Sequence, residues 1–518
     1  MKTMKNRILT IALAGMVTFA SCADLTVENL NSPDTERALS SASDLTTLAE
    51  GLVKTWYNAI HNYDGFKMPA AVLADASSCS WGNVGMREMG TEPRPSFNNS
   101  PSYNYLYLAA TPFTRMYSVN SSAVDVIKAV QGGVISFGSD GPRVEALSHF
   151  ARGIAMGYIA LAYDRGYIID ESTPQEEIIS PTLVDYNTMM THAIETLGKA
   201  ATLAKANSFQ LNETVIKTPG GVSSDQLAQL AHSFIARFMA NVARTEAERA
   251  AVDWASVITH VSSGIQTDFA IINQLAPWQG ADWYDEALIY SVYPGWGRVD
   301  MRVINMMDDS YPSHNPDGAD FAAPDSARIY DNAEVDDRLW TDYQHLPSNN
   351  FRPERGLYFF SSFRYDRHRD YVGPWDAQLV DLSVSEMHMY HAEALAQTGN
   401  LAGAAAILND PAGARKVRGG LPDVAADAAA IHAAIHHERM VETFLDGSGN
   451  EWFDMRGRDM LQAGSPLHWP IPADVLETLG IPLPYYTYGG ASAPATGNGA
   501  PEGDYWTSGT ASGAKSWR

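Results

Sequence analysis

The stretch HHERMVETFLDGSGNEWFDMRGRDMLQAGSPLHWPIPADVL, residues 436–476, sets large aromatic residues among closely spaced charges. A Trp-Phe pair at 452–453 directly precedes Asp454, and Arg456 follows two residues later. Large rings bury readily, whereas buried charges are stable only when they are paired and hydrogen-bonded. We therefore expect the two rings to be buried, and Asp454 and Arg456 to form ion pairs with each other or with the Glu-Arg pair at 438–439.

Three patterns in or next to this segment approach metal sites without completing them. HERMVE at 437–442 begins like a zinc-protease helix, but Val441 stands where the second histidine is required. His432 and His436 stand four residues apart on one helical face, yet no third ligand is identifiable. DGSGN at 446–450 lacks the sixth-position glycine and the closing glutamate of a calcium loop. We expect no metal and no cofactor.

Catalytic motifs are also missing from the rest of the sequence. The chain has no G-x-S-x-G elbow, no G-x-x-x-x-G-K-[ST] loop and no G-x-G-x-x-G motif opening a helix. A carboxylate pair for glycoside hydrolysis remains open, because the required separation is spatial rather than sequential. We expect a protein that is not an enzyme, with a lipid-anchored glycoside hydrolase as the alternative.

Helical periodicity dominates the chain outside this segment, and it is clearest in residues 40–61, 143–165, 224–243 and 383–409. Segments 145–166 and 385–408 carry alanine and glycine at spacings that allow helices to cross closely, and the second turns at Thr398-Gly399-Asn400. Tetratricopeptide-type helix pairs are built in this way, although the full consensus is missing. We predict a mainly α fold of degenerate helix pairs; the alternative is an ordinary helical bundle.

Residues 265–380 differ in texture, because proline, glycine, aspartate and aromatic residues crowd together there. The segment 276–298, APWQGADWYDEALIYSVYPGWGR, is typical, and GLYFFSSFRY at 356–365 is a candidate short strand. A long irregular stretch within a compact protein is usually functional. We expect a loop-rich second half with short strands.

The aromatic residues of this region are the positive sign of a binding site. Trp278, Trp283 and Trp296 lie close together in the sequence, with Tyr284 beside them. Flat rings in loops suit ligands with apolar C–H faces, sugars above all, while neighbouring polar groups bind hydroxyls. We predict that these four residues bind a glycan; the alternative is that they form the core of an irregular subdomain.

The N-terminus has the layout of a secretory signal peptide. A basic head is followed by an apolar run from Ile8 to Ala20, too short to span a bilayer of about 30 Å as a helix. The Phe-Ala-Ser-Cys order ending at Cys22 is similar to the lipobox of bacterial lipoproteins, in which the cysteine is acylated. We predict lipidation at Cys22; the alternative is an ordinary signal with an incidental cysteine. Cys79 then has no intrachain disulfide partner.

The chain carries a formal net charge of −24 at pH 7 and has no basic patch interleaved with aromatic residues. A field of this sign repels nucleic acid and anionic lipid headgroups. We expect no nucleic-acid partner.

Several of these segments together resemble the SusD/RagB family of outer-membrane nutrient-binding lipoproteins. SCADLTVENLNSPD (21–34) is similar to the family's lipidated start, EALSHFARGIAMGYIALAYDRG (145–166) and EMHMYHAEALAQTGN (386–400) to two of its helices, and VDDRL (335–339) to its Asp-x-Arg element. The most specific match is 436–476, which follows the pattern Glu-Arg…Trp-Phe-Asp-Leu-x-Arg with a Pro-Ile-Pro end.

The resemblance implies a SusD-like fold and a function without catalysis. The protein would be anchored by lipid to the outer membrane and exposed at the cell surface. It would bind an oligosaccharide, or another nutrient such as a peptide, and deliver it to a SusC-like TonB-dependent transporter. By comparison with starch-binding members, Trp81 and Asn83 are added to the predicted ligand residues, although their spacing differs from the starch-binding pattern. The implied organisation is a signal peptide (1–21), a lipidated tether (22–35), a helical part (36–264) and a loop-rich C-terminal part (265–518).

Overall fold

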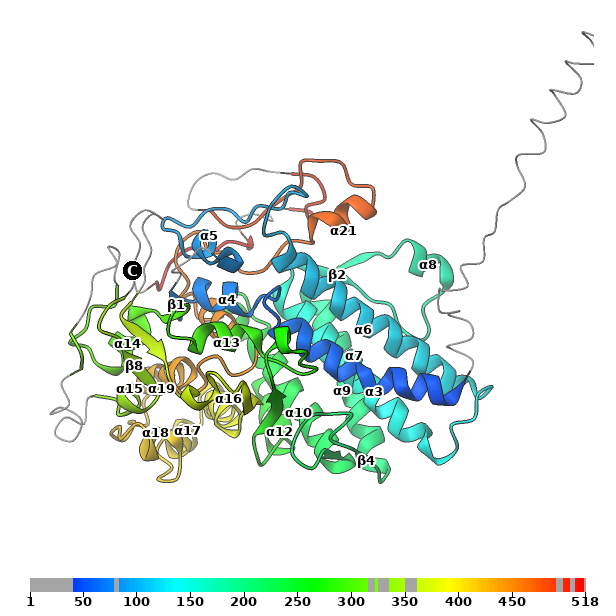
Figure 1. Ribbon diagram of the computed structural model, residues 1–518, viewed down its shortest axis with the longest axis horizontal. Coiled ribbons are helices and arrows are strands. Elements are labelled where there is room, and N and C mark those ends of the chain that lie inside the picture. Colours follow the sequence, from blue (N-terminus) through cyan, green and yellow to red (C-terminus); the bar gives the residue numbers. More distant parts are fainter. Residues whose placement is uncertain are drawn as a thin grey trace, which may run out of the picture.

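Long helices fill the first half of the chain in the computed structural model, which describes residues 41–78, 83–314, 322–324, 335–349, 361–490, 497–503 and 508–516 (Figure 1). The main helices of this half are α3 (Ala42–His61), α6 (Tyr107–Gly132), α7 (Gly141–Ala162), α9 (Tyr186–Ala206), α10 (Ser224–Asn241) and α12 (Trp254–Ser262). The main helices of the second half are α16 (Val384–Gln397), α17 (Leu401–Leu408), α19 (Ala428–Val441) and α20 (Asn450–Arg456).

Short elements connect and cover these helices. The short helices are α4 (Lys67–Leu73), α5 (Met86–Gly90), α8 (Gln175–Ile179), α11 (Glu246–Ala250), α13 (Glu286–Val292), α14 (Met301–Met307), α15 (Arg338–Thr341), α18 (Ala414–Val417) and α21 (Ala473–Thr478). The described strands form antiparallel pairs: β1 (Ser77–Ser78) with β7 (Arg298–Val299), β2 (Arg165–Tyr167) with β3 (Leu183–Asp185), β4 (Gln210–Leu211) with β5 (Val222–Ser223), β6 (Phe269–Gln274) with β10 (Asp376–Leu382), and β8 (Tyr343–His345) with β9 (Phe363–Tyr365).

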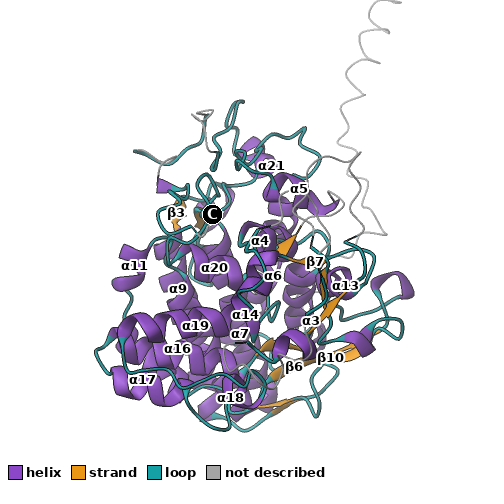
Figure 2. Cartoon of the chain, turned by 90° about the vertical axis from the view of Figure 1, so that its left-hand side faces the viewer, coloured by secondary structure: helices purple, strands orange, loops and turns teal. Residues whose placement is uncertain are grey.

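The long helices pack in sequence order. Helix α3 packs on α6, α6 on α7, α7 on α9, α9 on α10, α10 on α12, and α12 on α16, which in turn packs on α17 and α19. Figure 2 shows α16, α17 and α19 gathered at one end of this stack. Each helix therefore buries its apolar face mainly against its chain neighbours, as in helical repeat proteins. The prediction of a mainly α fold with tetratricopeptide-like helix pairs is confirmed.

Small residues allow the closest of these crossings. A Cβ atom placed on Gly157 of α7 would lie 2.0 Å from Cε2 of Phe238 in α10, a separation that no side chain tolerates. The second small-residue segment divides as predicted, because α16 ends at Gln397 and Gly399 turns the chain with a φ of 88°. Asn400 then accepts a hydrogen bond from the amide of Gly403 at 2.9 Å and caps α17.

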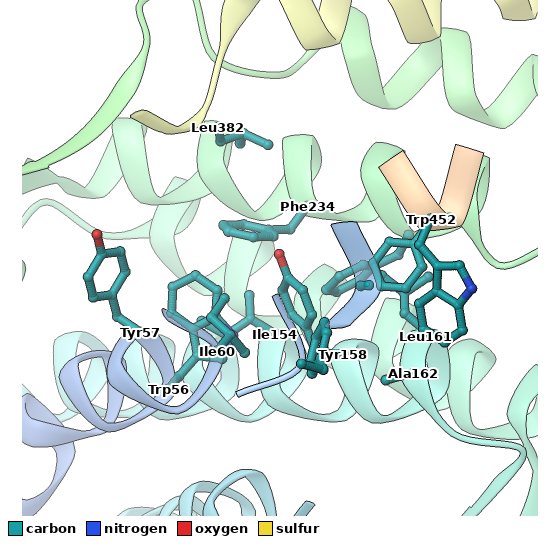
Figure 3. Close-up of a cluster of buried hydrophobic side chains, with 14 of the residues drawn as sticks. Trp56, Tyr57, Ile60, Ile154, Tyr158, Leu161, Ala162, Phe234, Leu382 and Trp452 are labelled. Atoms are coloured by element: carbon teal, nitrogen blue, oxygen red, sulfur yellow. The ribbon is translucent and has the colours of Figure 1, made fainter. Parts of the chain in front are cut away.

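The core joins the helical stack to the C-terminal part. Trp56 of α3 packs against Phe234 of α10 at 5.5 Å between ring centroids and against Tyr158 of α7 at 5.8 Å, as Figure 3 shows. Trp452 and Phe453 of α20 are fully buried in the same cluster, as predicted. The two parts of the sequence therefore share one hydrophobic core.

The charged residues of segment 436–476 are held by specific contacts, but not all of these contacts are the predicted ones. The carboxylate of buried Asp454 lies 2.9 Å from Nη1 of Arg439 and 2.8 Å from Nε of Arg458. Burial raises its pKa, but the arginines outweigh burial and hold the pKa well below its usual range. The expected ion pair of Arg456 is wrong, because its guanidinium donates to the carbonyls of Leu161, Leu467 and Asn241. It serves as a link between backbone segments instead.

The near-metal patterns resolve into structural contacts. Burial lowers the pKa of His436 to about 4, so its ring is neutral at pH 7, and its Nδ1 lies 2.7 Å from Asp454. Its Nε2 lies 2.6 Å from Nη2 of Arg302, so both ring nitrogens are engaged. Burial raises the pKa of Asp446 to about 8, which leaves a neutral carboxyl in the calcium-like loop. Among the described residues, no group of three or more His, Cys, Asp or Glu side chains is arranged to hold a metal.

Candidate functional site: a row of aromatic rings

Aromatic rings from two distant chain segments form a continuous row at the surface, here called the aromatic row. Trp278 contacts Trp375 at 5.9 Å between centroids, Trp375 lies 6.5 Å from Tyr293, and Tyr293 lies 4.5 Å from Trp296. Tyr290 closes the row, stacked on Trp296 at 5.8 Å. Trp278 is 59% exposed, and Tyr293 and Trp296 are each 37% exposed. Three rings therefore offer open apolar surface in one place.

Pairing of β6 with β10 brings the two segments together. In the antiparallel register Gln274 lies opposite Asp376, so the next residues outward, Leu275 and Trp375, leave the ladder side by side. Both adopt left-handed backbone, with φ of 69° and 53°, which is rare for bulky residues and costs about 1–2 kcal/mol each. Such strain persists where the surroundings enforce it, often at functional sites. Here the two strained residues lie at the point where the aromatic row begins.

Trp375 is the fixed ring of the row. It is only 7% exposed and packs edge-on against buried Tyr371 at 5.3 Å. It touches the exposed rings of Trp278 on one side and Tyr293 on the other. Trp375 therefore contacts both exposed rings and fixes their positions relative to each other.

The loop before α13 is held by side chains of α3. Lys54 pairs with the carboxylate of Asp282 at 3.1 Å, and Asn58 donates to the carbonyl of Asp282 at 2.9 Å. One turn later, Asn62 donates to the Tyr284 hydroxyl at 2.8 Å. These three side chains stand four residues apart and therefore lie on one helical face. They hold Asp282 and Tyr284 of the loop, so a single helix fixes the position of the loop.

Helix α13 carries the far end of the row and is anchored through Asp285. The Asp285 side chain accepts from the amide of Leu288 at 2.8 Å and caps α13. Its other oxygen lies 2.6 Å from Nζ of Lys67 and 2.8 Å from Nδ1 of His61. Burial raises the pKa of Asp285, but Lys67 and His61 outweigh it and hold the pKa well below its usual range. An ionised, buried carboxylate thus sets the position of α13 and of Tyr290 within it.

A polar cavity lies beside the row, on the same loop. It measures about 340 Å³ and includes the side chain of Asp282, which is 83% exposed. The loop that lines it, from Leu275 to Trp283, also carries Trp278. The residues lining the cavity are Thr214, Lys217, Ile272, Gln274, Leu275, Gly280, Ala281, Asp282 and Trp283. Hydrogen-bonding groups are therefore available on the loop that carries Trp278.

The structure separates the residues predicted to bind ligand. Trp278 and Trp296 lie exposed in the aromatic row, but Trp283 is only 5% exposed and packs against Tyr57 at 5.5 Å. Tyr284 is half-buried, and its hydroxyl accepts a hydrogen bond from the side chain of Asn62. Trp81 lies outside the described residues, as do the side chain of Asn83 and both cysteines, Cys22 and Cys79.

Sequence reasoning missed Trp375, which stands far along the chain from the Trp278 to Trp296 cluster. The available signal was the pair of apolar strand segments next to it, since β10 begins directly after Trp375 and its first residue, Asp376, pairs with Gln274 at the end of β6. Short strands inside an irregular region give little periodicity to find. The grouping of these rings therefore depends on a long-range contact that local patterns do not reveal.

Comparison with solved structures identifies the architecture. A SusD superfamily protein from Bacteroides vulgatus superimposes with a TM-score of 0.55 over 85% of this chain and 97% of its own, at 14% identity. The fold is SusD-like. Two further SusD-like carbohydrate-binding proteins agree: one from B. vulgatus (TM-score 0.54, 14% identity, 82% of this chain and 86% of that chain) and one from B. fragilis (TM-score 0.52, 14% identity, 81% and 86%).

The resemblance read from the sequence is thus confirmed for the SusD-like fold. No protein-family model matches the sequence, and no curated protein matches it either. Within the described residues, no helix is long and apolar enough to cross a membrane.

Proposed function

We propose that this SusD-like protein binds an oligosaccharide along the aromatic row, without chemical change, and delivers it to a SusC-like TonB-dependent outer-membrane transporter. The observation that carries the proposal is the continuous row in which Trp278, Tyr293 and Trp296 remain exposed around a fixed Trp375. Apolar rings in an exposed row suit the C–H faces of successive sugar rings. The two similar proteins from B. vulgatus and B. fragilis that are described as carbohydrate-binding support the ligand class.

The expected affinity is modest. A sugar face covering roughly 50 Å² of each exposed ring contributes about 1.2 kcal/mol per ring at about 25 cal/mol/Å². Three rings give near 4 kcal/mol, which corresponds to a dissociation constant of about 1 mM before hydrogen bonds from the polar cavity add to it. Such binding suits capture followed by handover rather than storage.

A glycan array tests this function. The protein beginning at Ala23 is applied to the array, and each hit is then followed by calorimetry and by product analysis of the incubated glycan. The proposal predicts micromolar to millimolar binding and an unchanged glycan. Release of shorter sugars would contradict it and support the hydrolase alternative, whereas a blank array together with binding of peptides would reassign the cargo.

Anchoring through Cys22 is part of the same proposal. A cysteine modified with two or more acyl chains anchors a protein stably, because each buried methylene adds about 0.8 kcal/mol. Cys22→Ser removes the acyl acceptor, so labelled palmitate should no longer be incorporated and the protein should leave the membrane fraction. Cys79→Ser is the matched control and should keep both the label and the membrane location. Palmitate incorporation into Cys22→Ser would contradict the assignment.

A further inference from the structure

A second cavity lies far from the aromatic row, where α11, α19 and the residues after α20 meet. Its volume is about 470 Å³. Figure 2 shows α11, which contributes to it, and α13, which carries part of the aromatic row, on opposite sides of the molecule. The residues lining this cavity, here called the arginine cavity, are Glu246, Arg249, Ala250, Gln397, Ala429, His432, Ala433, Gly457, Arg458, Met460 and Lys515.

The floor of the arginine cavity belongs to a buried cluster with more positive than negative groups. Glu393 lies 2.6 Å from Arg249 and 3.0 Å from Arg458, and Asp454 lies 2.8 Å from Arg458 and 2.9 Å from Arg439. All five side chains are at least 90% buried. Three guanidinium groups therefore surround two carboxylates. At the rim, Lys515 and Glu246 pair with each other at 2.5 Å and add no net charge.

Two donors of the arginine cavity have no partner in the part of the chain that the structure describes. Arg458 is 7% exposed; its Nε donates to Asp454 at 2.8 Å and its Nη2 to Glu393 at 3.0 Å, but its Nη1 has no acceptor among the described residues. The half-buried ring of His432 likewise forms no hydrogen bond within the described chain. Nη1 of Arg458 thus faces the cavity as a charged donor, to which a ligand acceptor can bind in place of water.

His432 lies among charges of both signs. Burial is the main cause that lowers its pKa; the Glu393 carboxylate opposes this, and the charges of Arg458 and Arg249 add to the lowering. Its imidazole is therefore neutral at pH 7 and can donate one N–H. The rest of the lining includes the apolar side chains of Ala250, Ala429, Ala433 and Met460, together with polar Gln397.

We propose that the arginine cavity binds a small organic carboxylate with an apolar body. Its carboxylate accepts hydrogen bonds from Nη1 of Arg458 and from the His432 ring, and compensates the excess positive charge of the cluster. Its apolar body packs against the alanine and methionine side chains above. The site is separate from the aromatic row, so it stands or falls independently of glycan binding.

Benzoate is the first probe, with benzamide as its neutral counterpart of the same shape. Calorimetry at pH 7 should show saturable benzoate binding at least tenfold tighter than benzamide binding. The affinity for benzoate should decrease as salt is added. Equal affinity for the two compounds, or no saturable benzoate binding, would overturn the proposal.

A filling variant locates the site without touching its charges. Ala429→Trp places a large ring in the cavity from an exposed position of α19, and should weaken benzoate binding at least tenfold. Ala406→Trp is the control, because Ala406 is also exposed on a helix but does not line the cavity. Melting temperatures check that both variants fold. Benzoate binding that survives equally in both variants would place it elsewhere and overturn the assignment.

Discussion

Nζ of Lys67 lies 2.6 Å from Oδ2 of Asp285, and only 2% and 3% of the two side chains are exposed. This buried ion pair connects α4 in the first part of the chain to the N-terminal cap of α13, which carries Tyr290 of the aromatic row. His61 extends the connection, since its Nε2 lies 2.9 Å from Asp381 in β10, the strand that follows Trp375. The two segments of the aromatic row are thus tied to one buried charge network.

Removing the lysine from this network should destabilise the protein strongly. Lys67→Met leaves the Asp285 carboxylate buried with less compensation, which typically costs about 3–5 kcal/mol. Lys54→Met is the matched control, because Lys54 pairs with Asp282 at the surface, where such pairs contribute about 0–1 kcal/mol. Urea unfolding measures both. A loss for Lys67→Met no larger than that for Lys54→Met would show that the buried pair does not hold α13.

The buried carboxyl of Asp446 should make stability depend on pH. Burial raises its folded pKa to about 8, and in the unfolded chain the pKa returns to about 4. Between these two pH values, folding is therefore coupled to the uptake of a proton by Asp446. The contribution of this proton uptake to the unfolding free energy is fully present below pH 4. It is lost as the pH rises to 8, at no more than about 1.4 kcal/mol per pH unit. Asp446→Asn removes this loss, so the variant should gain stability relative to wild type between pH 5 and pH 8. A difference in unfolding free energy that is the same at both pH values would contradict the assignment.

The crossing of α7 and α10 should not tolerate a methyl group at Gly157. The added Cβ would overlap the ring of Phe238, and overpacking of this kind costs about 1–3 kcal/mol. Gly198→Ala in α9 is the control, because nothing lies within 4 Å of the added atom and alanine favours the helix by about 0.5–1 kcal/mol. Opposite signs are therefore expected in urea unfolding. Stabilisation by Gly157→Ala would show that the two helices do not meet this closely.

The tryptophans predicted together should separate into two classes. Trp283 is buried against Tyr57, so Trp283→Ala should cost about 3–5 kcal/mol of unfolding free energy. Trp278 is mostly exposed, and Trp278→Ala should change stability by no more than about 0.5 kcal/mol. Thermal unfolding of the two variants side by side gives the comparison. A larger loss for Trp278→Ala would mean that its ring is part of the core.

Local patterns in the sequence predicted the helices well. The segment 40–61 corresponds to α3, and the break at Thr398-Gly399-Asn400 separates α16 from α17. Both follow from short-range physics: apolar spacing along one helical face, and a glycine followed by a capping asparagine. The burial of Trp452 and Phe453 was also predictable locally, since large aromatic rings bury readily.

Long-range contacts explain what the sequence could not predict. Arg456 binds carbonyls of three segments far apart in the chain rather than a nearby carboxylate, and no spacing rule reveals this. Trp283 and Trp278 stand close in sequence, but the turn between them sends one ring to the core and the other to the surface. The aromatic row exists only because β6 and β10 pair.

The central claim is that the exposed rings of the aromatic row bind the ligand, and one calorimetric comparison tests it most directly. The oligosaccharide with the strongest array signal is titrated into wild type, Trp278→Ala and the control Ile179→Ala, whose side chain is 75% exposed on α8. Loss of about 1.2 kcal/mol per ring predicts that Trp278→Ala binds roughly eightfold more weakly, while the control matches wild type. Equal affinity in all three proteins, with the melting temperatures unchanged, would contradict the claim.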